Sequence, residues 1–188
     1  MSADGEVLTG LWFEGSRGQL KGRLACEGRD LPVFRETRRW LDIYFSGRQP
    51  DFTPRCRLDG LTSFRREIVN ALLAIPFGET VTYGDIATAL ARKRGIAKMS
   101  ARAVGGAVGW NPICVIVPCH RVVGARRSLT GYGGGIMNKV GLLALEGHDV
   151  ASFAKGATKP RRGAGFFSER HVCGPCAVSS LENFSRMA

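Results

Sequence analysis

Two stretches of the chain alternate hydrophobic and polar positions with the period of an α-helix. Over residues 32–45 aromatic and aliphatic side chains stand among charges, and over residues 61–75 they recur at spacings of three and four. Three shorter helices are expected over residues 82–91, 100–108 and 136–145.

Local signals mark the helix ends. Thr62 or Ser63 can cap the helix over 61–75, and Pro76 stops it. Asp85 follows Thr82 by three residues, which is the spacing of a capping box. The helices over 82–91 and 100–108 are joined by a basic linker and resemble a helix-turn-helix pair, although plain helical hairpins are at least as common.

The expected strands are few and short. Residues 7–13 are rich in β-forming side chains, and residues 122–123 should form a strand. The apolar run 113–117 is strand-like and ends at Pro118. Together with the helices, this pattern predicts an α+β fold.

Prolines and a change of composition divide the chain. A connector with Pro50 and Pro54 follows the first helix. We therefore predict a small α/β amino-terminal domain over residues 1–55 and a mainly helical main domain over residues 56–150. Residues 151–188 turn to Gly, Lys, Arg and Ser, which predicts a mobile basic tail.

Composition and charge narrow the class of protein. The chain is 44% hydrophobic and 23% charged, it has no apolar run long enough to cross a bilayer, and its first residues lack the pattern of a secretion signal. The net charge of +11 favours a polyanionic partner, nucleic acid first, although a generally basic surface is the alternative. We expect a cytoplasmic protein that associates with the nucleoid or nucleus through DNA.

The helix over 100–108 is almost without side chains, and the basic charge lies just before it. Gly105 and Gly106 each cost about 1 kcal/mol in a helix relative to alanine. Close helix packing would explain them, and so would close approach to another backbone, such as a narrow DNA groove. Residues 91–102, which run into the start of this helix, hold five cations and no acid, namely Arg92, Lys93, Arg94, Lys98 and Arg102.

Cys119 is the strongest candidate for chemistry. It follows Pro118 and stands beside His120 and Arg121. A thiol reacts as its thiolate, so a neighbouring base or positive charge can activate it. Sequence neighbours often point apart, which keeps a structural role open for this pair.

The remaining cysteines give little sign of a metal or a disulfide framework. Cys173 and Cys176 form a Cys-x-x-Cys beside His171, but a second pair of ligands is missing. Cys26 and Cys56 have no histidine nearby. We expect no metal and no cofactor. The glycine-rich loop over 128–135 lacks the spacing of nucleotide-binding loops, so we expect it to line a pocket.

Several motifs occur in a characteristic order. They are Ala101-Arg102-Ala103-Val104-Gly105-Gly106, Asn111-Pro112, Pro118-Cys119-His120-Arg121-Val122, Thr130-Gly131-Tyr132 and Glu146-Gly147-His148. Over residues 62–148 the chain thereby resembles the O6-alkylguanine-DNA alkyltransferases. The resemblance implies repair of double-stranded DNA by a single, stoichiometric transfer of the alkyl group from O6-alkylguanine to a cysteine, with O4-alkylthymine as a further candidate substrate.

The resemblance also implies that residues 56–150 are the DNA-binding and catalytic domain, and it implies roles for residues of the reaction. Cys119 is the acceptor, His120 is the base that ionises it through a water, and Glu146 orients the histidine. Tyr83 polarises or protonates the leaving guanine. Asn111 shapes the active-site turn and could hydrogen-bond the loop that bears Tyr132.

Contacts with DNA and with the alkyl group follow from the same resemblance. Arg102 is the finger that fills the space left when the damaged base leaves the stack. The residues of its helix that are expected to face the groove are Ala101, Gly105 and Gly106. Arg121 is expected to make a further DNA contact. The residues expected to border the alkyl pocket are Pro118, Tyr132 and Gly134.

The chain departs from the family's pattern at a few places. A strand that usually precedes residues 7–13 is not apparent, and the stretch 93–99 is longer than usual. Arg127 stands where a turn glycine is common, and Val140-Gly141 replaces a charged and bulky pair.

Two other functions remain open. A non-catalytic binder of alkylated DNA would keep the helix and the arginine but lack the cysteine. A cysteine hydrolase would use the same Cys, His and Glu on a carbonyl and would turn over. We expect a monomer in either case.

Overall fold

The structure is a computed structural model that describes residues 1–13, 16 and 30–153. Within this part of the chain lie five α-helices, and all five segments predicted as helices are confirmed. They are α1 (Pro32–Phe45), α2 (Ser63–Leu73), α3 (Tyr83–Lys93), α4 (Ala101–Val108) and α5 (Ile136–Leu145). The predictions for Cys26, for the Cys-x-x-Cys motif and for the tail beyond Phe153 fall outside the described residues.

The helix starts use the predicted caps. The Thr62 hydroxyl accepts a hydrogen bond from the backbone N–H of Arg65. Thr82 and Asp85 form the predicted capping box, with the Asp85 carboxylate 2.8 Å from the Thr82 backbone nitrogen. This box makes Tyr83 the first residue of α3 and fixes the direction in which its side chain leaves the helix.

Four short strands form two pairs. β1 (Ser2–Ala3) pairs antiparallel with β2 (Leu8–Gly10), so a strand does precede residues 7–13 and the expectation that it is missing was wrong. β3 (Val81–Thr82) pairs parallel with the predicted strand β4 (Val122–Val123). β3 was not predicted, because two residues between a turn and a helix carry no periodicity.

The apolar run 113–117 is a tight turn and not a strand. The backbone N–H of Val117 donates to the Ile113 carbonyl at 3.1 Å, and Val115 has φ 70°. A left-handed conformation is strained for a β-branched residue, so the surrounding contacts must hold it. The run is apolar because it is buried on all sides, which is why its composition alone suggested a strand.

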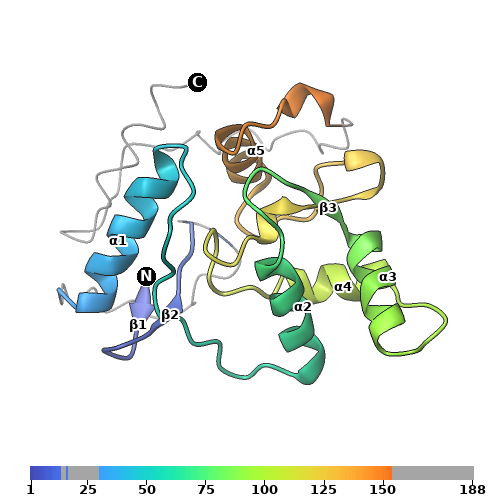
Figure 1. Cartoon of the computed structure of the whole chain (residues 1–188), viewed down its shortest axis with the longest axis horizontal. Coiled ribbons are helices and arrows are strands. Elements are labelled where there is room, and N and C mark those ends of the chain that lie inside the picture. Colours follow the sequence, from blue (N-terminus) through green and yellow to red (C-terminus); the bar gives the residue numbers. More distant parts are fainter. Residues whose placement is uncertain (14–15, 17–29, 154–188) are drawn as a thin grey trace.

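One hydrophobic core joins the amino-terminal segment to the rest of the protein. Leu8, Leu11 and Trp40 belong to the same buried cluster as Ile68 of α2 and Cys119. In Figure 1, α1 lies on one side of the molecule and α2, α3 and α4 pack together on the other. The proposed domain boundary near residue 55 stays a prediction.

Within the described ranges, no helix has both the length and the apolar character needed to cross a membrane.

The Thr82 cap should be needed to hold α3. We expect Thr82→Ala to lower the free energy of unfolding by about 1 kcal/mol, because the Asp85 backbone N–H would lose its acceptor. Urea denaturation followed by circular dichroism measures this loss. Thr53→Ala, an exposed threonine outside the helices, is the matched control and should change stability by less than about 0.5 kcal/mol.

Candidate functional site

Cys119 is the first residue of a short 3-10 helix, Cys119–Arg121, that follows the tight turn. Its side chain is buried. Asn111 lies beneath the turn and points its amide nitrogen at the Cys119 sulfur, 3.0 Å away, and at the Val117 carbonyl, 2.9 Å away. The Asn111 oxygen accepts from the backbone N–H of Ile113. These hydrogen bonds go to the tight turn and to Cys119, and not to the loop that bears Tyr132 as suggested from the sequence.

The surroundings of Cys119 favour its thiolate. A hydrogen bond from the Cys114 thiol lowers the pKa of Cys119, burial opposes this, and Asn111 and the positive charge of Lys139 lower the pKa further. The net effect is a lowered pKa. The hydrogen bond to Cys119, together with burial, raises the pKa of the Cys114 thiol, so Cys114 remains the proton donor of the pair.

Cys114 and Lys139 were not predicted as site residues. Lys139 is fully buried in α5 and donates from Nζ to the Val122 carbonyl. Burial lowers its pKa to about 8, whereas the nearby Cys119 acts to raise it. A cysteine in an apolar run reads as core. A single lysine in a helix reads as surface. Neither position therefore gave a usable signal.

His120 and Glu146 form a buried pair. His120 Nε2 lies 2.8 Å from Glu146 Oε1, and neither side chain is exposed to solvent. Burial acts to raise the pKa of Glu146, but hydrogen bonds from His120, Arg121 and Tyr44 outweigh it and lower the pKa to about 2. The carboxylate is therefore charged at neutral pH and also accepts from the Gly78 backbone N–H at 3.1 Å.

The hydrogen bonds of His120 define its tautomer. Burial lowers its pKa, so the imidazole is neutral at pH 7 even though Glu146 favours the charged form. The proton is assigned to Nε2 because that nitrogen faces a carboxylate. Nδ1 has no hydrogen-bond partner within the described part of the chain. Nδ1 is thus the nitrogen able to accept a proton.

Arg121 points into the protein and not toward a DNA-binding surface. Its guanidinium donates to both oxygens of Glu146, with Nε 2.9 Å from Oε2, and to the Ile75 carbonyl at 2.7 Å. Its side chain is only 11% exposed. The expectation that Arg121 contacts DNA does not fit this geometry, since its donors are already used to hold Glu146.

Two tyrosines border the Cys119 thiol. The Tyr83 hydroxyl lies 3.4 Å from the carbonyls of both Thr130 and Gly131. Burial and the negative charge of Cys119 raise the pKa of Tyr83 to about 12. The same two causes raise the pKa of Tyr132. Both phenols therefore stay protonated at neutral pH.

Gly134 and Pro118 are small, buried residues near Tyr132 and Cys119. Gly134 is buried, and a methyl group there would lie 2.7 Å from the Tyr132 ring, so a side chain at this position would clash with that ring. Pro118 is buried directly before Cys119 and ends the tight turn. Pro118 thus adjoins Cys119 in the chain, Tyr132 lies near enough for the Cys119 charge to act on it, and Gly134 lies against Tyr132.

The exposed face of α4 carries almost no side chains. Ala101 and Arg102 are exposed, and Arg102 forms no hydrogen bond or ion pair with the residues that the structure places. A methyl group at Gly106 would meet nothing within 4 Å, whereas one at Gly105 would touch the Tyr83 ring at 3.8 Å. Packing inside the protein therefore does not explain Gly106.

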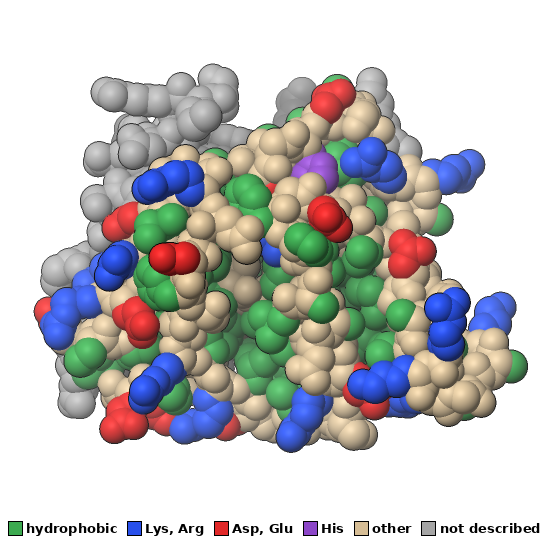
Figure 2. Space-filling model, viewed as in Figure 1, with side chains coloured by type: hydrophobic (Ala, Val, Ile, Leu, Met, Phe, Trp, Pro, Cys, Tyr) green, Lys and Arg blue, Asp and Glu red, His purple; other side chains and the backbone are tan. Residues whose placement is uncertain are grey.

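Positive charge gathers beside α4. Figure 2 shows Lys and Arg side chains over the loop that joins α3 to α4, and the exposed cations of this region include Arg92, Lys93 and Lys98. Arg94 is partly neutralised by Glu67 at 3.0 Å. The loop forms most of the longer stretch noted in the sequence. We refer to Arg92 and Lys93 in the last turn of α3, together with Lys98 in the loop, as the basic loop.

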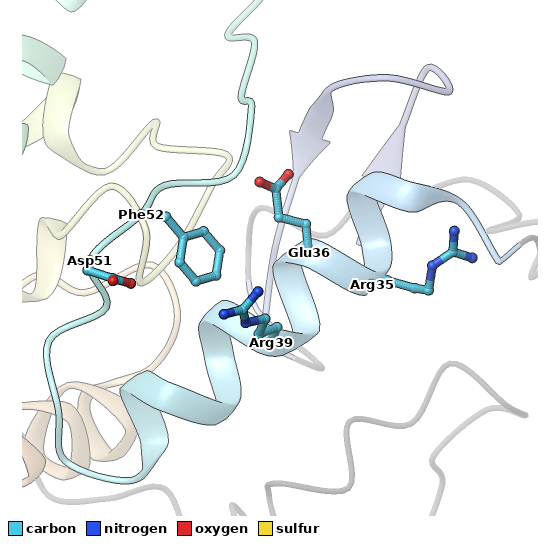
Figure 3. Close-up of a pocket in the computed structure, with 5 residues that line it drawn as sticks. All are labelled: Arg35, Glu36, Arg39, Asp51 and Phe52. Carbon is cyan, nitrogen blue, oxygen red and sulfur yellow. The ribbon is translucent and has the colours of Figure 1, made fainter.

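A separate surface pocket lies on α1. Arg35, Glu36 and Arg39 line it together with Asp51 and Phe52, and Arg39 lies over the Phe52 ring at 5.3 Å (Figure 3). Its charges are mixed and it contains no nucleophile, so it does not compete with the Cys119 site. The described residues contain no cluster of three or more His, Cys, Asp or Glu side chains that could hold a metal ion.

Comparison with known proteins identifies the family of this chain. Residues 63–148 match the model of the 6-O-methylguanine DNA methyltransferase, DNA binding domain. The methylated-DNA–protein-cysteine methyltransferase of Haemophilus influenzae is 38% identical over 170 residues, which cover 90% of this chain and 89% of the relative. This chain belongs to the methylated-DNA–protein-cysteine methyltransferase family.

Other members of the family support the assignment and the fold. The methyltransferase of Mycobacterium leprae is 48% identical over 118 residues, covering 63% of this chain and 68% of the relative. The crystal structure of Mycobacterium tuberculosis OGT in complex with DNA superimposes with a TM-score of 0.65 and 41% identity, covering 78% of this chain and 85% of that chain. The predicted α+β fold and the resemblance to the alkyltransferases are thereby confirmed.

Glu146 should stabilise the protein only where it is ionised. Its pKa is lowered in the folded state, so its contribution is complete above its ordinary pKa of 4.5 and is lost as the pH falls through about 2. We expect Glu146→Gln to cost about 2–3 kcal/mol at pH 7, because Arg121 loses a buried charge partner. Urea denaturation at several pH values should show the difference from the unmodified protein narrowing below pH 4.5.

The exposed Glu79 provides the matched control for this experiment. Glu79→Gln should change the free energy of unfolding by less than about 0.5 kcal/mol. A loss for Glu146→Gln that is equally large at pH 2 and pH 7 would contradict the stabilising role of its charge.

Proposed function

We propose that Cys119 is the residue that accepts the alkyl group when this methyltransferase repairs alkylated DNA. In the proposed reaction the thiolate attacks the saturated carbon bonded to O6 of guanine. A carbon–sulfur bond forms, the carbon–oxygen bond breaks, and guanine leaves with the bonding electrons. The thioether on Cys119 is stable, so each protein molecule acts once.

His120 is the proposed base for this step. Nδ1 takes the proton of Cys119 through a bridging water, and Glu146 stabilises the imidazolium that results. The lowered pKa of His120 supports this role, because the ring is neutral before the reaction and able to accept. Asn111 would hold the sulfur in place through its amide, 3.0 Å away.

Tyr83 is the proposed donor to the leaving guanine. Expelling guanine as an anion is unfavourable, so a nearby acid should protonate or polarise it. Tyr83 keeps its proton at neutral pH and lies close enough to Cys119 for the thiolate charge to affect its pKa. Tyr132, Pro118 and Gly134 would then border the alkyl group.

The proposed DNA contact is the exposed face of α4. The damaged base must leave the stack to reach a buried thiol, and Arg102 would occupy its place. Ala101 and Gly106 allow the helix backbone to approach the groove, and the open space around Gly106 supports this explanation. The basic loop would contact neighbouring phosphates.

The preferred substrate in this proposal is O6-alkylguanine in double-stranded DNA, and the protein acts as a monomer. The observation that carries the proposal is the buried Cys119 beside a neutral histidine and an ionised glutamate. A non-catalytic damage binder would have no use for this acceptor. A hydrolase would leave the side-chain-free surface of α4 unexplained.

Stoichiometric labelling tests the proposal. The protein is incubated with a duplex that contains O6-methylguanine, and intact protein and its peptides are weighed by mass spectrometry. We expect one methyl group on Cys119 per molecule, and none on Cys119→Ala. Substrate conversion beyond one equivalent would favour a hydrolase. Tight binding of the duplex with unmodified Cys119 would favour a damage sensor.

Arg102→Ala should separate base flipping from chemistry. We expect the rate of methyl transfer from duplex DNA to fall roughly 10- to 100-fold, because the unstacked state loses the side chain that fills the gap. The rate with free O6-benzylguanine should not change, because a free base needs no flipping. Arg48→Ala removes the same charge from the segment after α1 and serves as the control. Equal losses in both variants would point to a general charge effect.

A further inference from the structure

The amino-terminal segment reaches into the catalytic hydrogen-bond network. Tyr44 lies in the last turn of α1 and its side chain is almost completely buried. Its hydroxyl donates to Glu146 Oε1 at 2.7 Å. The Tyr44 hydroxyl oxygen also lies 3.2 Å from His120 Nε2. Tyr44 is 76 residues from His120 and 102 residues from Glu146 along the chain.

Aromatic packing holds the hydroxyl in this place. The Tyr44 ring stacks on Trp40 with centroids 5.3 Å apart and an interplanar angle of 8°. The rings of Phe45, Phe77 and His120 meet it edge to face at 5.5, 5.9 and 6.3 Å. A ring enclosed on several sides cannot turn its hydroxyl away without disturbing the core.

The chemistry of a phenol at this position is restrictive. Burial and the Glu146 charge raise the pKa of Tyr44 well above its ordinary value, so it keeps its one hydrogen. That hydrogen points to Glu146, because a carboxylate is the stronger acceptor. The phenol oxygen then presents a lone pair to His120 Nε2–H. Tyr44 therefore fits only the tautomer that leaves Nδ1 without a proton.

We propose that Tyr44 is a positioning residue for alkyl transfer, which fixes the His120 tautomer and tempers the charge of Glu146 through its hydroxyl. This inference rests on the proposed role of His120 as the base. It makes α1 part of the active site. The groups that act electrostatically on His120 come from four places in the chain, and they are Tyr44, Arg121, Lys139 and Glu146.

Tyr44→Phe removes the hydroxyl and keeps the ring. Without this donor, Glu146 acts more strongly on His120 and stabilises the imidazolium, so the pKa of His120 rises. Below that raised pKa the histidine already carries its second proton and cannot accept the proton of Cys119. We expect the single-turnover rate at saturating O6-methylguanine duplex to fall about tenfold, with the acid limb of its pH profile moved to higher pH. The Kd for the duplex, obtained from the dependence of the rate on duplex concentration, should not change.

Trp40→Phe is the matched control, because it disturbs the stacking on Tyr44 and removes no group from the network. It should leave the acid limb in place. In Tyr44→Phe combined with Glu146→Gln, the rate should be no lower than in Glu146→Gln alone, because the hydroxyl acts through that carboxylate. Equal effects of Tyr44→Phe and Trp40→Phe, or losses that multiply in the double variant, would overturn the inference.

A measurement on the unmodified protein avoids any dependence on how the variants fold. The 15N chemical shifts of the His120 ring at neutral pH should show the proton on Nε2. A proton on Nδ1 would overturn the inference. Failure of the unmodified protein to methylate Cys119 would instead overturn the proposed function, so the two ideas can fail separately.

Discussion

The buried carboxylate of Glu146 is the constraint around which the site is organised. An ionised carboxylate in the interior is unfavourable unless hydrogen bonds and opposite charge satisfy it. Four residues from three parts of the fold do so here: Tyr44 in α1, Gly78 in the turn before β3, and the neighbours His120 and Arg121 after the tight turn. The requirement to satisfy one charge therefore joins the amino-terminal segment, the short 3-10 helix Cys119–Arg121 and the end of α5.

The tight turn before Cys119 is the second element of the site. Val115 adopts a left-handed conformation there, and Asn111 bonds the turn at both ends. Backbone bonds from Leu11 add support, since its N–H donates to Pro112 and its carbonyl accepts from Cys114. Strain of this kind persists only where the surroundings determine the backbone, as they do beside a reactive group. The turn thereby presents the sulfur to Asn111 and Cys114 together.

Much of the fold could be predicted from the sequence. The helices follow from hydrophobic spacing and from caps such as Thr82 with Asp85, which are local signals. The turn at 113–117 was mistaken for a strand, because an apolar run is compatible with any fully buried backbone. β1 and β3 were not predicted, because a two-residue strand is defined by the strand it pairs with and not by a pattern in its own sequence.

The site was predictable only where side chains belong to a recognisable motif. Cys119, His120 and Glu146 were named together. All three are buried, and His120 Nε2 lies 2.8 Å from Glu146 Oε1. Tyr44 reads from the sequence as one aromatic residue on an amphipathic helix, and nothing local reveals its hydrogen bonds. Arg121 was assigned to DNA from the resemblance to the family, and nothing in its sequence neighbours shows that its donors are used inside the protein. Tertiary contacts that span many residues decide both cases.

A direct titration of Cys119 would test the central claim that the buried surroundings of this cysteine favour its thiolate. Thiolate absorbance near 240 nm can be followed against pH, with Cys119→Ser subtracted to isolate one sulfur. The hydrogen bonds from Cys114 and Asn111, with the charge of Lys139, predict a pKa below the ordinary value of about 8.5. A pKa at or above that value would mean that burial outweighs these groups, and it would contradict the account.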